Sequence, residues 1–117
     1  MPESWEHLFS YGTLRLEAVQ RSTFGRTLDG RADRLPGYVL TLIEITDAAV
    51  VATSGQTHHP MLVHTGRPQD LVDGAVFAIT PAELAQADAY EVADYKREHV
   101  ILASGQQAWV YVDAREA

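Results

Sequence analysis

The chain has 117 residues, 46% of them hydrophobic, with 9 Lys and Arg against 16 Asp and Glu, a formal charge of −7, and no cysteine. This length predicts a single domain, residues 1–117, that buries about two thirds of its unfolded surface. The lack of cysteine excludes disulfides, zinc–cysteine sites, iron–sulfur clusters and thiol nucleophiles. The acidic balance, with Lys96 as the single lysine, argues against nucleic-acid binding, which needs clustered positive charge.

The distribution of apolar residues bears on the cellular location. No apolar run approaches the roughly 20 residues that span a bilayer. Residues 1–7 are acidic and lack the basic region followed by an apolar run that marks a secretory signal. We therefore expect a cytoplasmic protein without membrane association.

Several short runs rich in β-branched and aromatic residues predict strands. The first strand ends at Gly12, and the residues that follow, 14–23, predict only a short helical turn. Asp73 and Gly74 form a dipeptide typical of tight turns and precede another strand. The last two strands form a hairpin across residues 104–107. The predicted strands are, in chain order, 8–11, 38–45, 61–64, 75–79, 99–102 and 108–112.

One helix has a clear start signal. Thr80 and Glu83 have the spacing of a capping box, and Pro81 stands at the first helical position, so a helix is predicted from Pro81 to about Tyr90. Many short strands with one well-defined helix predict an α+β domain, whose sheet we expect to curl into a small β-barrel of mixed strands.

The end of this helix carries a candidate functional acid. Leu84, Ala87 and Glu91 are spaced i, i+3 and i+7, so another helical turn would put the Glu91 carboxylate on the apolar stripe. The alternative is that the helix stops near Tyr90 and leaves Glu91 and the neighbouring acids in solvent, where most charged side chains lie.

The loop after the first strand is a second candidate. Phe9 to Arg15 read as a strand running into a loop that contains Gly12. Such a loop can turn consecutive backbone N–H groups toward one point and bind a carboxylate or a developing oxyanion. An ordinary turn explains the same residues when they are taken alone.

Together these features resemble a known family. Tyr-Gly-Thr-Leu at residues 11–14 is followed by Leu-Pro-Gly-Tyr at 35–38, Pro60 before a strand, Asp-x-x-Glu at 88–91 and Tyr-x-Arg at 95–97. In order and spacing, over nearly the whole chain, they resemble the γ-glutamylcyclotransferase-like family, which includes the AIG2-like proteins.

The resemblance implies an enzyme that closes a γ-glutamyl group into 5-oxoproline and releases an amine or amino acid. It implies Glu91 as general acid/base, a small-molecule γ-glutamyl substrate, and no cofactor or metal. Ala87 stands where the family usually has leucine, so the size of the substrate stays open. The alternative is a non-catalytic small-molecule binding or interaction domain that keeps the fold. The residues implied to bind substrate are Tyr11, Gly12, Thr13 and Leu14.

Two other kinds of site are weakly indicated. His58 and His59 are adjacent, and adjacent side chains on a strand point to opposite faces. No acid lies within this stretch either, which argues against a metal site with His64. Ser10 lies in no Gly-x-Ser-x-Gly motif, which argues against a serine hydrolase. The sequence makes no prediction about the oligomeric state.

Overall fold

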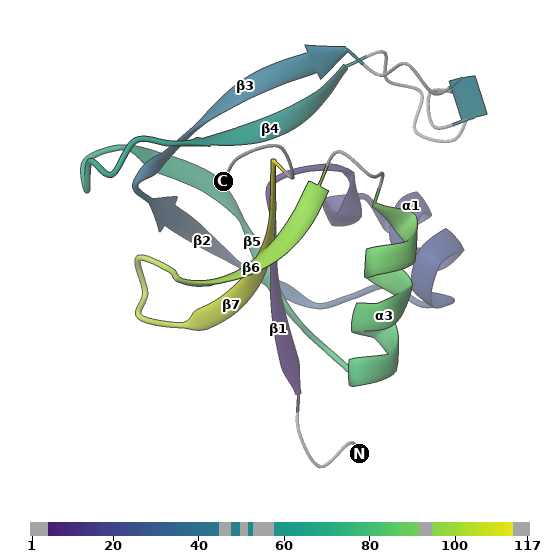
Figure 1. Ribbon diagram of the computed structural model, residues 1–117. Coiled ribbons are helices and arrows are strands. Elements are labelled where there is room, and N and C mark those ends of the chain that lie inside the picture. The colour runs from purple at the N-terminus through teal and green to yellow at the C-terminus, as the bar shows by residue number, and fades with distance from the viewer. Residues whose placement is uncertain (1–4, 45–47, 50–51, 53–57, 92–94, 114–117) are drawn as a thin grey trace.

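Short strands and two helices make up the described part of the chain (Figure 1). The computed structural model describes residues 5–44, 48–49, 52, 58–91 and 95–113. Within these ranges the elements are β1 (Glu6–Ser10), a 3₁₀ turn η1 (Thr13–Arg15), α1 (Glu17–Phe24), β2 (Gly30–Pro36), β3 (Tyr38–Glu44), β4 (His58–His64), β5 (Leu71–Ile79), α3 (Pro81–Tyr90), β6 (Tyr95–Ile101) and β7 (Gln107–Asp113).

The main sheet has five strands in the order β2-β5-β1-β7-β6, and β3 pairs with β4 in a separate two-stranded sheet. Strand β1 lies at the centre, antiparallel to β5 and parallel to β7, where Leu8 is opposite Trp109. All other described pairings are antiparallel. The sheet is therefore mixed, and β1 is covered by a neighbouring strand on each side.

The predicted α+β class is confirmed, but two parts of that prediction change. The sheet is not closed into a barrel, because among the described residues its outer strands β2 and β6 do not pair with each other. The stretch predicted as a short helical turn contains a second helix, α1, which ends at Gly25 in the left-handed conformation with φ 75°. Glycine adopts this conformation without the steric cost of a side chain, which explains why the helix ends there.

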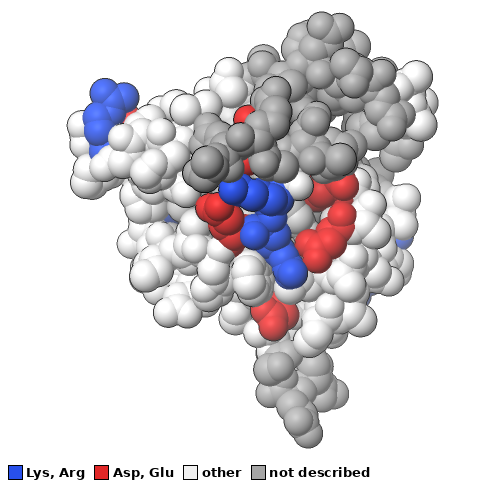
Figure 2. Space-filling model, viewed as in Figure 1, with Lys and Arg blue, Asp and Glu red and all other residues white. Residues whose placement is uncertain are grey.

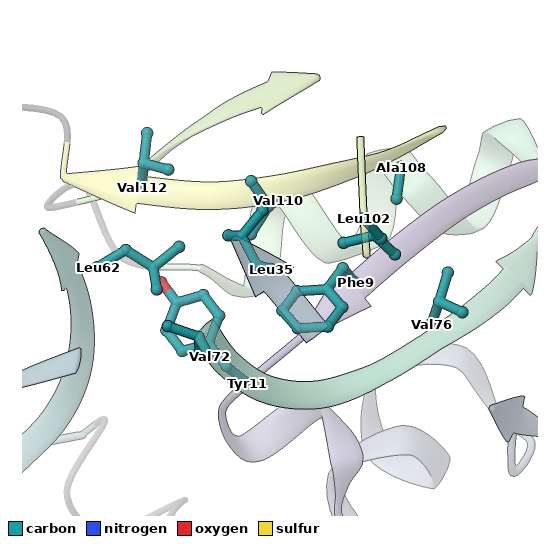
Figure 3. Packing of buried hydrophobic residues seen from close by; sticks show 10 residues of the cluster. All are labelled: Phe9, Tyr11, Leu35, Leu62, Val72, Val76, Leu102, Ala108, Val110 and Val112. Atoms are coloured by element: carbon teal, nitrogen blue, oxygen red, sulfur yellow. The ribbon is translucent and has the colours of Figure 1, made fainter. Parts of the chain in front are cut away.

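The sheet separates two apolar clusters, because successive side chains on a strand point to opposite faces. On β1, Phe9 belongs to one cluster and Leu8 to the other. The cluster of Leu8 packs against α1 and α3 through Val19, Leu84 and other buried residues. The cluster of Phe9 lies on the opposite face, and Figure 3 shows ten of its residues, including Tyr11.

Helix α3 begins as the sequence predicts. Thr80 accepts a hydrogen bond from the Glu83 amide, and the Glu83 carboxylate accepts one from the Thr80 amide, so the predicted capping box is formed. Glu83 also receives two hydrogen bonds of 2.8 Å from the guanidinium of Arg26. This charge-assisted pair links the segment after α1 to the start of α3.

Strands β2 and β5 depart from the predicted pattern. Strand β2 is absent from the prediction because its residues are mostly polar and exposed, as is common at the edge of a sheet. Strand β5 begins at Leu71, so Asp73 and Gly74 lie inside it rather than in a turn. Gly74 is needed for another reason: a Cβ there would lie 2.6 Å from the ring of Phe9 and would clash with the carbonyl oxygen of Ser10.

In the part of the chain that the structure describes, no helix is both long enough and apolar enough to cross a membrane.

Candidate active site

The loop of residues 11–14 follows β1, the central strand of the sheet. The last residue of β1, Ser10, is paired with Ala75 of β5, and β7 lies on the other side. Beyond Ser10 the chain leaves the sheet and forms the turn η1. The predicted substrate-binding residues therefore lie at the end of the central strand.

Tyr11 anchors the start of this loop. Its side chain is buried, and its phenol donates a 2.5 Å hydrogen bond to the backbone carbonyl of Tyr111 on β7. Burial raises the pKa of Tyr11 above its ordinary value, and the charges of Tyr95 and Glu91 raise it further. Tyr11 is therefore a neutral phenol that fixes the loop to the sheet.

The next three residues present two backbone donors. Gly12 has φ −127°, so it does not use the left-handed region, and its amide is 3.4 Å from the Ser10 hydroxyl. Leu14 is buried, whereas Thr13 is partly exposed. Among the described residues, the amides of Thr13 and Leu14 have no hydrogen-bond acceptor. Two consecutive N–H groups of this kind can bind an anionic oxygen.

Helix α3 ends before Glu91, which corrects the helical argument for that residue. Its last residue is Tyr90, and Glu91 follows as the C-cap, with extended φ −69° and ψ 139° and its amide bonded to the Ala87 carbonyl. Glu91 is thus not part of the apolar helical stripe. It is not in open solvent either, because the side chain is partly buried.

The carboxyl of Glu91 lies among phenols. Its charge contributes to the raised pKa values of Tyr11, Tyr90 and Tyr111, after the larger effect of burial in each case. Burial also raises the pKa of Glu91 itself to about 7. Among the described residues, no ion pair or side-chain hydrogen bond to Glu91 opposes this shift. The group therefore exchanges its proton near neutral pH.

A hydrogen bond joins the loop to the end of α3. The Thr13 hydroxyl and the Tyr90 phenol are 2.7 Å apart. Tyr90 immediately precedes Glu91, so this contact and the anchoring of Tyr11 bring the two predicted parts of the site together. The loop residues and Glu91, separated by about 80 positions in the chain, are neighbours in space.

Asp88, the other acid of the Asp-x-x-Glu pattern, connects three elements. Its carboxylate accepts a 2.8 Å hydrogen bond from the Tyr111 phenol and pairs with Arg97 at 3.3 Å. The Arg97 guanidinium also lies over the Trp109 ring, 4.4 Å from its centroid. Arg97 therefore braces Asp88 rather than Glu91, and Tyr111 joins α3 through its phenol and Tyr11 through its carbonyl.

The charges near this brace are largely compensated. Figure 2 shows a cluster of basic side chains near the centre of this face with acidic side chains on both sides of it, and a separate basic group at the upper left. Strand β6 lies on this face, and its Lys96 pairs with Glu98 at 3.4 Å, as Arg97 pairs with Asp88. These two basic side chains of β6 are therefore each paired with an acid.

Tyr90 and Tyr111 are the site residues that the sequence argument missed. Both are aromatic residues with a polar tip that finds a partner: Thr13 for Tyr90 and Asp88 for Tyr111. Such phenols are typical where an apolar body is buried and the hydroxyl is not. No spacing rule links them to their partners, which lie on other elements.

The structure also bears on metal binding. Within the described ranges, no group of three or more His, Asp or Glu side chains is placed to hold a metal ion. The side chains of His58 and His59 lie outside the described part of the chain.

Comparison with known proteins identifies the family. The profile of the family described as gamma-glutamyl cyclotransferase, AIG2-like, matches residues 8–116. No curated protein matches the sequence.

Solved structures share the fold. One is a gamma-glutamyl cyclotransferase with TM-score 0.72 and 15% identity, covering 95% of this chain and 68% of the other. A protein of Arabidopsis thaliana, solved in solution, has TM-score 0.70 and 23% identity over 94% of this chain and 62% of its own. An uncharacterized protein of Pyrococcus horikoshii has TM-score 0.66 and 18% identity over 95% and 80%. The chain thus spans about three fifths of the Arabidopsis protein's length.

The protein is a small α+β domain with a mixed sheet. The loop after the central strand and the partly buried carboxyl of Glu91, whose pKa is raised, form a candidate acid/base site. The chain belongs to the AIG2-like gamma-glutamyl cyclotransferase family.

Proposed function

We propose that this protein is a γ-glutamylcyclotransferase. The α-amine of a γ-glutamyl substrate attacks its own γ-carbonyl carbon, a new C–N bond closes the five-membered ring, and the old γ-amide C–N bond breaks. The products are 5-oxoproline and an amine or amino acid. Because nucleophile and electrophile belong to one molecule, the protein has mainly to hold the substrate in a folded, reactive conformation.

The observation that carries the proposal is the environment of Glu91. A carboxyl with a pKa of about 7 is present in both protonation states at neutral pH, as an efficient proton carrier should be. We assign it both proton transfers: the carboxylate accepts a proton of the substrate ammonium and returns it to the departing nitrogen. The second proton that the ring nitrogen loses passes to the released amine, which leaves as an ammonium. Because the nucleophile is the α-amine of the substrate, the reaction requires no nucleophilic side chain and no covalent enzyme intermediate.

The loop of residues 11–14 is assigned to substrate binding. The amides of Thr13 and Leu14, which have no acceptor in the part of the chain that the structure describes, are donors for the oxyanion that forms on the γ-carbonyl oxygen, or for the substrate α-carboxylate. Tyr11 and Gly12 hold this segment at the end of β1, with the Tyr11 phenol fixed by Tyr111. The family match and the contact of this loop with Tyr90 support the assignment.

The test is release of 5-oxoproline from a panel of γ-glutamyl amino acids, γ-glutamyl amines and glutathione. We expect turnover of at least one member by the wild-type protein and a loss of at least about a hundredfold in Glu91→Gln, which keeps the shape but carries no exchangeable carboxyl proton. Glu17→Gln is the matched control, because Glu17 is an exposed acid on α1 that pairs with Arg21.

Two results would contradict the proposal. Turnover by Glu91→Gln equal to wild type would remove Glu91 from the chemistry. Binding of γ-glutamyl compounds without 5-oxoproline formation from any of them would instead favour a binding domain that keeps the fold.

A further inference from the structure

Arg15 holds two main-chain carbonyls of the substrate loop. Its Nε donates to the Gly12 carbonyl at 3.3 Å, and its Nη2 donates to the Tyr11 carbonyl at 3.1 Å. The backbone amide of Arg15 donates to the Gly12 carbonyl as well, at 3.2 Å. Within the described residues this side chain, although exposed, forms no salt bridge with an acid. Its described partners are therefore main-chain oxygens, both in the loop.

The position of a carbonyl sets the direction of the amide in the same peptide group. The peptide bonds here are trans, so C=O and N–H point in opposite directions. The two carbonyls that Arg15 holds belong to the peptide groups that carry the Gly12 and Thr13 amides. With both oxygens drawn to one guanidinium, these amides point away from Arg15.

The remaining peptide groups of the loop are held in the same manner. The Thr13 carbonyl accepts from the Leu16 amide at 2.9 Å, which fixes the Leu14 amide. The Leu14 carbonyl accepts from Nε2 of the buried Gln20, also at 2.9 Å. The Tyr11 carbonyl is held by the exposed Arg15 side chain, and the Gly12 carbonyl is held by this side chain and by the Arg15 backbone amide together. The second of these peptide groups carries the Thr13 amide, which has no acceptor among the described residues.

We propose that Arg15 is a positioning residue that orients and polarises the Thr13 amide toward the oxyanion formed on the substrate's γ-carbonyl. The inference rests on the proposed function, since it needs the loop to face the reacting carbonyl. A cation on a peptide oxygen makes the N–H of that peptide a stronger donor, because hydrogen bonds in a chain polarise one another. Arg15 acts through the backbone and touches no reacting atom.

The kinetic test replaces the guanidinium. Arg15→Met is expected to lower kcat about tenfold with little change in KM, less than the loss caused by deleting an oxyanion donor itself. Arg15→Lys is expected to keep part of the activity, because an ammonium can still reach one carbonyl. Arg21→Met, at an exposed arginine in the last turn of α1, is the control and should retain wild-type kcat. An unchanged kcat in Arg15→Met, or a rise in KM alone, would overturn the inference.

A structural readout separates this inference from the proposed function. The ¹⁵N shift of an amide responds to hydrogen bonding at the preceding carbonyl, so Arg15→Met should move the Gly12 and Thr13 resonances, and Arg21→Met should not. If the wild-type protein forms no 5-oxoproline from any substrate, the proposed function fails. In that case unmoved Gly12 and Thr13 resonances would also remove the holding role of Arg15, whereas moved resonances would keep it.

Discussion

The hydroxyl of Thr13 and the phenol of Tyr90 lie 2.7 Å apart, and this contact fastens the loop after the central strand to the residue before Glu91. Their separation of 77 positions makes it a tertiary contact. This single hydrogen bond links a residue of the loop directly to Tyr90, the last residue of α3 and the neighbour of Glu91 in the chain.

Removing this bond should weaken both stability and activity. We expect Tyr90→Phe to cost about 1 kcal/mol of unfolding free energy, the usual net value of a partly buried hydrogen bond. It should also lower kcat/KM, because the loop is then less well held relative to Glu91. Denaturant unfolding and steady-state kinetics check the two effects. In a double-mutant cycle, Thr13→Val should add little to Tyr90→Phe, and full additivity would show that the bond contributes nothing.

The rate should depend on pH through Glu91. The carboxylate is the form that accepts the substrate proton, and burial raises the pKa of this group to about 7. We therefore expect kcat/KM of the wild-type protein to rise as pH increases through about 7. A pH–rate profile of wild type against Glu17→Gln measures this limb. A flat profile between pH 5 and about 8 would argue against Glu91 as the base.

Glu91 should also reduce stability at neutral and alkaline pH. Its pKa is raised in the folded state from 4.5 to about 7, so the folded protein holds this proton more tightly than the unfolded chain does. The penalty is absent below the unfolded pKa, grows as pH rises between these values, and is complete above about 7. At 1.36 kcal/mol per pKa unit it reaches up to about 3 kcal/mol.

Glu91→Gln should accordingly be more stable than wild type at pH 8 and about equally stable at pH 4. Urea unfolding at both pH values measures the difference. Equal stability of the two proteins at pH 8 would mean that the carboxylate is better solvated than its raised pKa indicates.

Two substitutions at Asp88 distinguish the stability contributed by its ion pair with Arg97 from that contributed by its hydrogen bond with Tyr111. Asp88→Asn removes the half-exposed ion pair with Arg97 but keeps an oxygen that can accept from Tyr111. We expect it to cost less than about 1 kcal/mol, as exposed ion pairs contribute little. Asp88→Ala removes both contacts and should cost about 1 kcal/mol more. Thermal or denaturant unfolding of both variants tests the order, and equal losses in the two variants would show that the ion pair dominates.

Gly74 should be intolerant of substitution. Alanine there would place a Cβ 2.6 Å from the Phe9 ring and against the Ser10 carbonyl oxygen, a backbone atom that cannot move without shifting the central strand. We expect Gly74→Ala to cost at least about 2 kcal/mol and to disturb the loop that follows Ser10. Ala78→Gly, at an exposed position of the same strand, should cost about 0.5–1 kcal/mol and is the control in unfolding measurements.

Local signals in the sequence specify helix α3 almost completely. The Thr80–Glu83 capping box and Pro81 predict its start, and both hydrogen bonds of the box are formed. A cap is built from residues three positions apart, so its geometry needs no knowledge of the rest of the fold. The apolar runs of the central strands are predictable for a related reason, since strands buried within a sheet are rich in β-branched and aromatic residues.

Strand β2 and Gly74 show where this local reasoning fails. The polar residues of β2 become a strand because the backbone of β5 lies beside them, in register from Gly30 opposite Phe77 to Pro36 opposite Leu71. Gly74 reads as a turn residue but is required by the close approach of β1. In both cases the deciding contact comes from a segment distant in the chain.

The amino-acid sequence by itself determined the acidic, cysteine-free character of this protein, its α+β class, helix α3, and the identity of the loop residues and Glu91 as candidates. Tertiary structure alone decided that Glu91 is partly buried. The helix ends at Tyr90, so the apolar helical stripe does not account for this burial. The raised pKa of this carboxyl results from burial, and burial depends on the elements that pack around the residue. The absence of cysteine is consistent with the proposed reaction, whose nucleophile is supplied by the substrate, and the folded chain adds the partly buried carboxyl that the proposal uses as proton carrier.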